Sequence, residues 1–472
     1  MREEEDFIGK VKVPDEAYYG SFTARAEKNF RLSGMKVDME LIRAVALIKK
    51  CAALANMELE RLDEKTGKAI AEVAQEVIDG KLDDEFVLDA FQAGAGTPLH
   101  MNVNEVIANR AEELLGGKKG EYKLVHPNNH VNMSQSSNNV VPSAVRIAAI
   151  KLSGNLINEA ELLQESFSKK SKEYEDVMKI GRTHLQDAVP MTYGQVFSAY
   201  ARAVEKDKES LESALEGLKE LGVGGTATGS GITAHPEFRG KICAYIAKEG
   251  KIDVKPAKDP VELTQNMNDF LMYSAAMRNY AATLCRIADD LRLLSSGPKA
   301  GIAEIKLPEV EPGSSIMPGK LNPSIPEAVN MVCWQVMGND SAVLLASRSG
   351  QLELNFAAPL IAYDILQSEG MLTRCSKMFR EFCIDGLEVD EKKAAENLEQ
   401  TFGYATAFNP YLGYSKVSKL VAEAYEKGVS LRKLIVEKGI MSEEDAEKII
   451  ASAKGPSLID EELKRGLEQD PS

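Results

Sequence analysis

Residues 313–323, GSSIMPGKLNP, form the segment of this chain whose side chains are best suited to chemistry. The segment is rich in Gly, Ser, Pro and Asn, so we expect a loop between two helices. Its groups able to bind an anion are Ser314, Ser315, Lys320 and Asn322. Composition alone leaves two interpretations open, because such a loop is either a catalytic lid or an ordinary connector.

Two further regions concentrate polar side chains. One is GRTHLQDAVP, residues 181–190, where His184 lies in a polar turn. The other combines GAGTPLHMNVNE, residues 94–105, with HVNMSQSSNN, residues 130–139. A single histidine is more often structural than catalytic, and a run such as QSSNN can be a helix cap or a turn. Each region taken alone therefore has a structural interpretation as well as a functional one.

The three regions together resemble a known family. The loop is similar to the signature GSSxMPxKxNP of the aspartase/fumarase superfamily and matches it at every fixed position. The other blocks agree at about the spacing that the family has, and the resemblance runs from AYYG near residue 17 to FNPYLGY at 408–414. It implies a mostly α-helical homotetramer with a 20-helix core, composite active sites built from three chains, and a small dicarboxylate as substrate.

Members of such a family remove ammonia or water from the position next to a carboxylate. The proton that must leave is barely acidic, because the carbanion adds charge to an existing anion. The enzyme therefore needs a base over the C–H bond, and donors and a cation that stabilise an enediolate dianion. Converging donors are sufficient for this, so we expect no cofactor and no metal.

The resemblance assigns the base to Ser314. A serine is too weak a base unless its oxyanion is stabilised, and backbone N–H groups around Gly313, Met317 and Gly319 are candidates for that role. Lys320 and Asn322 match residues that bind the carboxylate that becomes the dianion.

The remaining family positions surround the rest of the substrate. Thr183 and His184 match the pair that binds the other carboxylate, and we expect His184 to be catalytic. The cluster around the substrate's carboxylate and departing amino group matches Thr97, Ser136, Ser137 and Asn138.

Three short markers favour the ammonia-eliminating branch of the family. They are YYG at 18–20, GAGT at 94–97 and HLQDAVP at 184–190. The pair Ser136–Ser137 instead matches the water-eliminating branch. We therefore expect a carbon–nitrogen lyase that forms fumarate from L-aspartate, with class II fumarate hydration as the alternative.

The chain departs from both branches at two places. Asn139 stands where the family has Asp, which removes a negative charge near the leaving group. Leu99 and His100 stand where the family has Thr and Asn, so a titratable group is added. Both departures leave a related β-elimination substrate open. A structural protein that has lost its activity is disfavoured because the loop with Ser314 is intact.

Long apolar periodicities indicate the elements that must position these segments. Helices are expected at 143–173, 195–221, 261–296, 326–349 and 355–384. The stretch 261–296 has no Gly or Pro and would extend roughly 54 Å at ~1.5 Å per residue. We therefore predict an all-α fold whose centre is a bundle of about five long helices.

The bundle divides the chain into three expected domains. Residues 1–140 form a mostly helical N-terminal domain, 141–388 the long-helix bundle, and 389–472 a small helical C-terminal domain. The helix at 326–349 is apolar on all sides, which one chain cannot bury. This pattern independently predicts an oligomer that merges several bundles.

Charge and composition exclude several other classes of protein. The 472 residues carry a net charge of −15, which argues against nucleic acid or an anionic membrane as partner. The N-terminus MREEEDF is acidic and does not resemble a signal peptide, and no apolar run reaches ~18 residues. The six cysteines form no CxxC pair, so we expect buried free thiols and a cytoplasmic location.

The glycine-rich stretch GVGGTATGSG, residues 222–231, has two interpretations. It lacks the lysine of a Walker phosphate loop and does not fit the Rossmann pattern. We expect a tight passage between helices. It also resembles a family block that lies near the active site.

Overall fold

The computed structural model describes residues 1–456 and 458–469. Helices dominate, so the all-α prediction is confirmed. The chain divides into two compact units. The first unit comprises residues 1–159, 207–282 and 332–375, and the second comprises 160–206, 283–331 and 376–472. The three domain ranges expected from the sequence stay a prediction.

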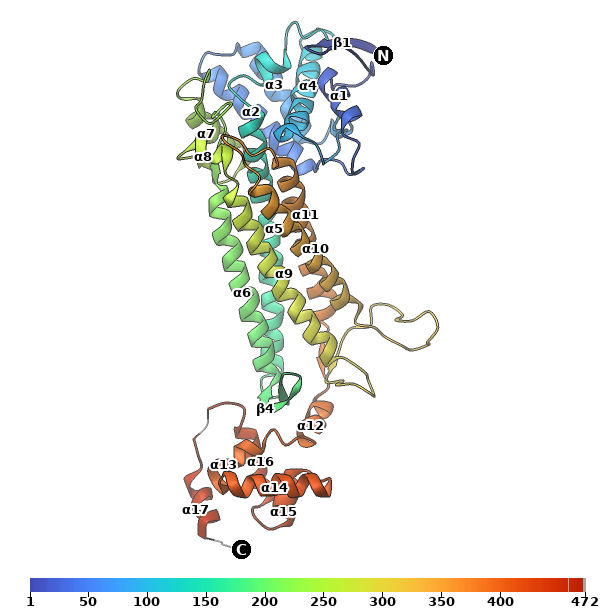
Figure 1. Cartoon of the computed structure of the whole chain (residues 1–472), viewed down its shortest axis with the longest axis vertical. Coiled ribbons are helices and arrows are strands. Elements are labelled where there is room, and N and C mark those ends of the chain that lie inside the picture. Colours follow the sequence, from blue (N-terminus) through green and yellow to red (C-terminus); the bar gives the residue numbers. More distant parts are fainter. Residues whose placement is uncertain (457, 470–472) are drawn as a thin grey trace. The chain divides into compact units, whose positions relative to one another are not determined.

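The first unit carries most of the N-terminal elements (Figure 1). Its strands form an antiparallel pair near the N-terminus and a short parallel pair: β1 (Arg2–Asp6) with β2 (Gly9–Val13), and β5 (Glu220–Leu221) with β6 (Lys255–Pro256). Its own helices are α1 (Ser21–Asn29), α2 (Met39–Glu58), α3 (Glu64–Ile78), α4 (Thr97–Leu114), α7 (Phe238–Gly250) and α8 (Pro260–Gln265). Short turns of helix lie at Asp83–Glu85, Gly94–Gly96 and Pro127–Val131.

The second unit contains the C-terminal helices and two antiparallel strand pairs. The pairs are β3 (Met178–Thr183) with β4 (Gln186–Thr192), and β7 (Ile305–Lys306) with β8 (Glu388–Val389). Its own helices are α12 (Glu391–Glu399), α13 (Ala405–Leu412), α14 (Tyr414–Lys427), α15 (Leu431–Glu437), α16 (Glu443–Ser452) and α17 (Glu461–Gln469). Ser442 caps α16 by accepting a hydrogen bond from the backbone of Asp445, as the acidic first turn indicates.

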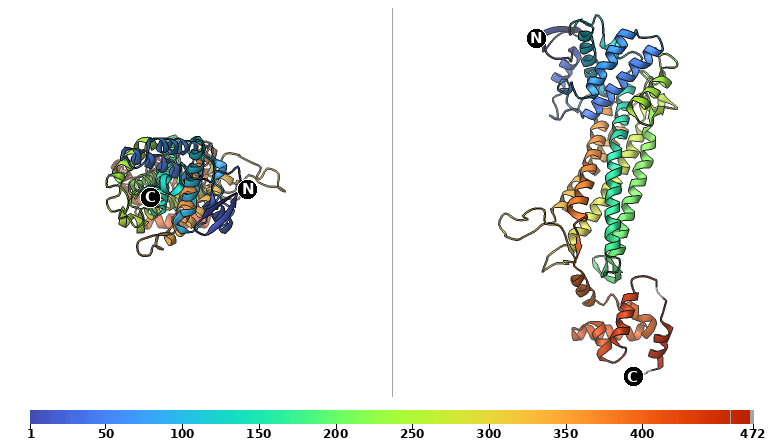
Figure 2. Two further views of the ribbon diagram at one scale, coloured as in Figure 1. Left: turned by 90° about the horizontal axis from the view of Figure 1, so that it is seen from above. Right: turned by 180° about the vertical axis from the view of Figure 1, so that it is seen from behind.

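Five long helices contribute segments to both units. They are α5 (Ser137–Glu173), α6 (Tyr193–Leu218), α9 (Asn268–Leu294), α10 (Ser324–Ser347) and α11 (Ala358–Phe379), and a π-helical turn, Arg380–Ile384, follows α11. Within each unit their segments lie side by side (Figures 1 and 2). The predicted long-helix bundle is therefore present, with boundaries close to those expected.

The prediction of a single helix over 261–296 is wrong, because the helix is interrupted between α8 and α9. Asn266 leaves the helical region, with φ −110° and ψ 132°. Its side-chain oxygen accepts a hydrogen bond from the backbone N–H of Asn268 at 3.1 Å. Asparagine side chains compete in this way with helical backbone bonds and favour caps. The absence of Gly and Pro therefore did not guarantee an unbroken helix.

A buried guanidinium ties three long helices together in the first unit. Arg146 of α5 is 1% exposed and donates to the carbonyl of Gly217 at 2.7 Å and to Asp269 at 2.8 Å. Burial lowers the pKa of Arg146, and Asp269 opposes that shift. Nearby, the Tyr273 hydroxyl donates to the buried carboxyl of Glu369 at 2.7 Å, which joins α9 to α11. Polar groups thus fix how these helices register against one another.

In the second unit, aromatic rings join the long helices to one another. Phe167 of α5 lies edge-on to Tyr200 of α6, with ring centroids 5.6 Å apart, and packs against Phe379 of α11. The hydroxyl of Tyr200 donates to Asp290 of α9 at 2.9 Å. Four of the five long helices are therefore joined through one small cluster.

Helix α10 buries only one side within the chain. Val329, Cys333 and Val336 are fully or almost fully buried, whereas Trp334 is 58% exposed and Leu345 is 61% exposed. Apolar side chains gathered on one exposed helix face are typical of a protein–protein contact. The apolar pattern read from the sequence is therefore present as an uncovered surface.

Two observations bear on membranes and thiols. Among the described helices, α5 is long and apolar enough to cross a bilayer by composition, but 67% of its most apolar window is buried in the structure, as in a core helix. All six cysteines are buried and free, which confirms the prediction made from their spacing.

Replacing Asp269 by Asn should lower the free energy of unfolding by ~3 kcal/mol. The variant leaves the Arg146 charge buried without its counter-ion, and partial exposure of Asp269 (33%) places the cost at the low end for buried pairs. Urea denaturation followed by circular dichroism measures the change. The double variant Arg146→Met/Asp269→Asn should recover much of the loss, and a wild-type midpoint for Asp269→Asn alone would contradict the assignment.

Candidate active site

The loop at residues 313–323 is closed on itself by backbone and amide hydrogen bonds. The N–H of Gly313 donates to the carbonyl of Lys320 at 2.9 Å, and the Asn322 side chain donates to the carbonyl of Gly313 at 2.5 Å. A Cβ at Gly313 would lie 2.6 Å from the Lys320 oxygen, so only glycine allows this approach. The loop thus has a defined shape, and Lys320 lies exposed on it.

Two backbone amides converge on the hydroxyl of Ser314. Its Oγ accepts hydrogen bonds from the N–H of Met317 at 2.9 Å and of Ile316 at 3.2 Å. Donors in this position stabilise a serine oxyanion relative to the neutral hydroxyl. Met317 is one of the donors expected from the sequence, whereas the N–H of Gly313 is occupied by the loop closure.

Thr183 and His184 form the tip of the β3–β4 hairpin. His184 and Leu185 both have positive φ, 56° and 58°, as the two-residue turn of a tight hairpin requires. Thr183 pairs with Gln186 across the turn. Both Thr183 and His184 are exposed in the chain, and Leu185 beside them is 72% exposed.

Buried contacts at its base hold the hairpin rigid. Arg182 donates to the fully buried Glu304 at 2.6 Å, and the Tyr193 hydroxyl and the Asn397 amide also donate to that carboxylate. Burial alone would raise the pKa of Glu304, but these hydrogen bonds hold it below its ordinary value. Ile180 packs into the apolar cluster of the C-terminal helices. The hairpin therefore projects His184 from a fixed base.

The other predicted residues lie where α4 and α5 begin. Thr97 starts α4, and its hydroxyl donates to the carbonyl of Gly94 at 2.7 Å. A Cβ at Gly96 would lie 2.9 Å from the Val141 side chain, so the start of α4 approaches the first turns of α5 closely. Ser137 is the first residue of α5, and Ser136 accepts from the N–H of Asn138 at 3.3 Å.

The glycine-rich stretch expected as a tight passage lies beside this cluster. The side chain of Asn138 donates to the carbonyl of Ala227 at 2.7 Å. A Cβ at Gly229 would lie 2.4 Å from the carbonyl oxygen of Pro260, which confirms that the passage is tight. Asn139 is buried, and its amide donates to Thr264 at 2.9 Å. This departure from the family pattern therefore points into the protein core.

A buried polar network that sequence reasoning missed lies behind Ser137. His100 Nδ1 lies 2.8 Å from Ser137 Oγ, and its Nε2 contacts the ammonium of Lys49. Burial lowers the pKa of His100 well below its usual range, and Lys49 lowers it further. The available signal was a lysine inside the apolar run VALIKKCAALA of α2, whose partners come from distant segments.

The structure brings the nine predicted residues together only in part. Thr97, Ser136, Ser137 and Asn138 belong to the first unit, and Thr183, His184, Ser314, Lys320 and Asn322 belong to the second. Within the described part of the second unit, no hydrogen bond joins the hairpin to the loop. The predicted residues thus fall into one group in the first unit and two segments, the hairpin and the loop, in the second.

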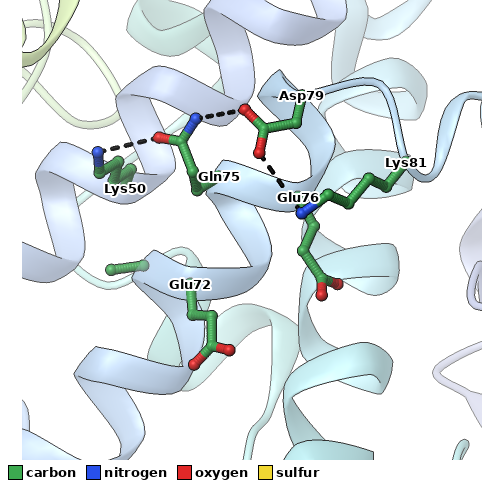
Figure 3. Close-up of a pocket in the computed structure, with 7 residues that line it drawn as sticks. Lys50, Glu72, Gln75, Glu76, Asp79 and Lys81 are labelled. Atoms are coloured by element: carbon green, nitrogen blue, oxygen red, sulfur yellow. Dashed lines mark hydrogen bonds and ion pairs between the residues drawn. The ribbon is translucent and has the colours of Figure 1, made fainter.

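The surface has a cavity beside the loop and another away from the predicted site residues. A cavity of about 480 Å³ borders the loop and is lined by residues that include Glu309, Ser314, Met317 and Lys320. Figure 3 shows another, of about 380 Å³, on α2 and α3. There Lys50 donates to Gln75, and Gln75 donates to Asp79. None of the predicted site residues lines the second cavity.

Three polar segments mounted on a long-helix bundle define a class of lyase, and known proteins agree. Residues 9–338 match the family model described as lyase, and residues 405–454 match that of the fumarase C C-terminus. The chain is 44% identical to an aspartate ammonia-lyase of Bacillus sp, with 95% of this chain and 96% of that protein covered. It is 43% identical to a class II fumarate hydratase of Campylobacter jejuni, with 96% and 98% covered.

Solved structures agree as well. A structure described as fumarate lyase and delta crystallin, from Brucella melitensis, superposes with a TM-score of 0.94 at 41% identity, covering 96% of this chain and all of that one. A class II fumarase of Schistosoma mansoni gives 0.93 at 35% identity, covering 97% and 100%. The chain belongs to the aspartase/fumarase superfamily and is a lyase.

Replacing Gly313 by Ala should lower lyase turnover at least ~100-fold, a loss expected when a general base is displaced. The added Cβ would meet the Lys320 carbonyl and open the loop that positions Ser314. The melting temperature should hardly change, because the loop is largely exposed. Gly240→Ala is the matched control, since its Cβ would meet open space. Wild-type turnover by Gly313→Ala would show that loop closure does not position the base.

Proposed function

We propose that this protein is an aspartate ammonia-lyase, which reversibly eliminates ammonia from L-aspartate to give fumarate. The observation that carries the proposal is the state of His100. Both of its ring nitrogens are engaged by protein partners, Lys49 and Ser137, and the ring is 1% exposed. His100 is therefore not free to protonate a departing hydroxyl, which is what dehydration of malate would need.

Hydroxyl and amide groups suit an amine leaving group better. The α-ammonium of aspartate needs acceptors and departs as neutral ammonia without receiving a proton. Thr97, Ser136 and Asn138 supply such groups where α4 and α5 begin, and Ser137 beside them donates to a substrate carboxylate. The Bacillus relative named aspartate ammonia-lyase supports this choice, whereas the Campylobacter relative named class II fumarate hydratase keeps hydration as the alternative.

The proposed reaction begins with proton removal at the loop. The Ser314 oxyanion, stabilised by the N–H groups of Ile316 and Met317, takes the proton from the carbon next to the carboxylate. The electron pair moves into that carboxylate, and Lys320 and Asn322 bind the resulting enediolate. Collapse of the enediolate forms the double bond and expels ammonia. Thr183 and His184 bind the other carboxylate. No metal or cofactor is assigned a step.

We propose further that the active form is a homotetramer in which three chains complete each site. Three exposed apolar groups support this assembly: Trp334 and Leu345 on α10, Leu185 beside His184, and Ile316 in the loop. Merging such surfaces would bring the separate functional segments of different chains together. We place the protein in the cytoplasm, a proposal supported by its six buried free thiols.

The substrate assignment predicts a strong preference. L-Aspartate should be deaminated with a kcat/KM at least ~100-fold higher than that for dehydration of L-malate, equivalent to ~2.7 kcal/mol. Fumarate absorbance measures both reactions on one preparation. His100→Asn serves as the diagnostic variant. Malate as the better substrate, with loss of that activity in His100→Asn, would establish the hydratase instead.

The assembly predicts complementation between two inactive variants. Ser314→Ala and His184→Ala should each lose turnover, because each lacks one part of every site. Refolding them together should restore part of the activity. Some sites then combine Ser314 from a His184→Ala chain with His184 from a Ser314→Ala chain. Refolding Ser314→Ala with the double variant Ser314→Ala/His184→Ala is the control and should restore none.

Light scattering provides the independent check on the assembly. The expected mass is about 206 kDa, four times 51.6 kDa. A monomer at micromolar concentration, or no recovery in the mixture, would contradict the composite site.

A further inference from the structure

Lys49 is a fully buried lysine for which the described residues provide no acidic partner. It lies on α2 and is 0% exposed. Its ammonium contacts His100 Nε2 and donates to Asn132 Oδ1 at 3.0 Å and to Gln135 Oε1 at 2.8 Å. None of the ion pairs among the described residues includes Lys49. Burial lowers the pKa of Lys49 well below its usual range, so an ammonium at this position depends on the groups that face it.

The two amides are oriented so that only acceptors face Lys49. The Gln135 amide nitrogen donates to the carbonyls of Val131 and Met133, at 3.0 and 3.1 Å. The Asn132 amide nitrogen donates to the carbonyl of Gln135 at 3.3 Å. Their oxygens are thereby turned towards the lysine. With the imidazole nitrogen, the surroundings offer three acceptors, which is the number of N–H donors on an ammonium.

The same arrangement favours one tautomer of the His100 ring. If Nε2 accepts from the ammonium, the ring is neutral and carries its proton on Nδ1. Nδ1–H then donates to Ser137 Oγ across 2.8 Å. The hydroxyl hydrogen of Ser137 is left free to donate outwards, at the start of α5.

We propose that Lys49, His100 and Ser137 form a positioning relay in which the buried lysine is the counter-charge for a dicarboxylate held by Ser137. Lys49 and His100 do not touch the substrate, and Ser137 transmits their effect to it. The relay rests on the proposed function in one respect, that Ser137 contacts a substrate carboxylate. It also explains His100, since the ring has one nitrogen to accept from Lys49 and another to donate to Ser137.

A matched control lies next to Lys49 in the sequence. Lys50 pairs with Glu249 at 2.6 Å and with Gln75 at 3.0 Å, beside the cavity in Figure 3. Its removal deletes the same charge from the same helix without affecting the relay. Lys50→Met therefore separates a specific effect of Lys49 from a change in net charge.

The test measures the dissociation constant of succinate, a dicarboxylate that cannot eliminate ammonia, by calorimetry on the assembled full-length protein. Lys49→Met and His100→Leu should weaken succinate binding at least ~10-fold. His100→Gln should stay within ~3-fold of the wild type, because a glutamine can accept from Lys49 and donate to Ser137. Lys50→Met should bind as the wild type does. Melting curves confirm that each variant is folded, and the two His100 variants decide the question if Lys49→Met does not fold.

Each outcome either supports the relay or overturns it. A purely structural role would shift melting temperatures but leave succinate affinity unchanged, and that result in Lys49→Met or His100→Leu overturns the proposal. Equal losses in His100→Gln and His100→Leu also overturn it. A wild type that binds succinate without deaminating L-aspartate refutes the proposed function while the variants still decide the relay. A wild type that binds no succinate overturns the relay, whereas the proposed function is decided separately by whether L-aspartate is deaminated.

Discussion

The chemistry proposed for this protein depends on one constraint: a barely acidic C–H bond loses its proton only where several donors, a cation and a base converge on an anion. Flexible segments cannot maintain that geometry. The chain meets the constraint by joining each functional segment to the beginning of a long helix. Ser137 starts α5, the hairpin of His184 runs directly into α6, and the loop of Ser314 leads into α10. Helix N-termini also carry partial positive charge, which favours anionic ligands.

The rigidity of those helices comes from a few buried groups rather than from apolar packing alone. Arg146 links α5, α6 and α9 through two hydrogen bonds, and Glu304 collects three donors beneath the hairpin. Such groups are costly to bury and tolerate few arrangements, so they specify register as well as stability. The same argument makes Lys49 unusual, because its hydrogen bonds are satisfied although no carboxylate pairs with it in the described part of the chain.

Much of this architecture could be predicted from local pattern. Apolar periodicity located the long helices, and the composition of residues 313–323 located the loop. The interruption of the helix at Asn266 was not predicted, because it depends on a side-chain cap that competes with the helical hydrogen bonds. The contacts of Lys49 were not predicted for another reason: its acceptors come from residues 51 to 86 positions away in the sequence. Periodicity identifies which face of a helix is buried but not which distant polar group will meet it.

The exposed face of α10 also carries the only tryptophan of the chain, Trp334. A tryptophan that passes from water into an apolar contact changes the wavelength of its emission. The protein therefore contains its single tryptophan at the surface where its subunits are proposed to meet. Excited at wavelengths that tyrosine does not absorb, its emission can follow association in real time and without a label.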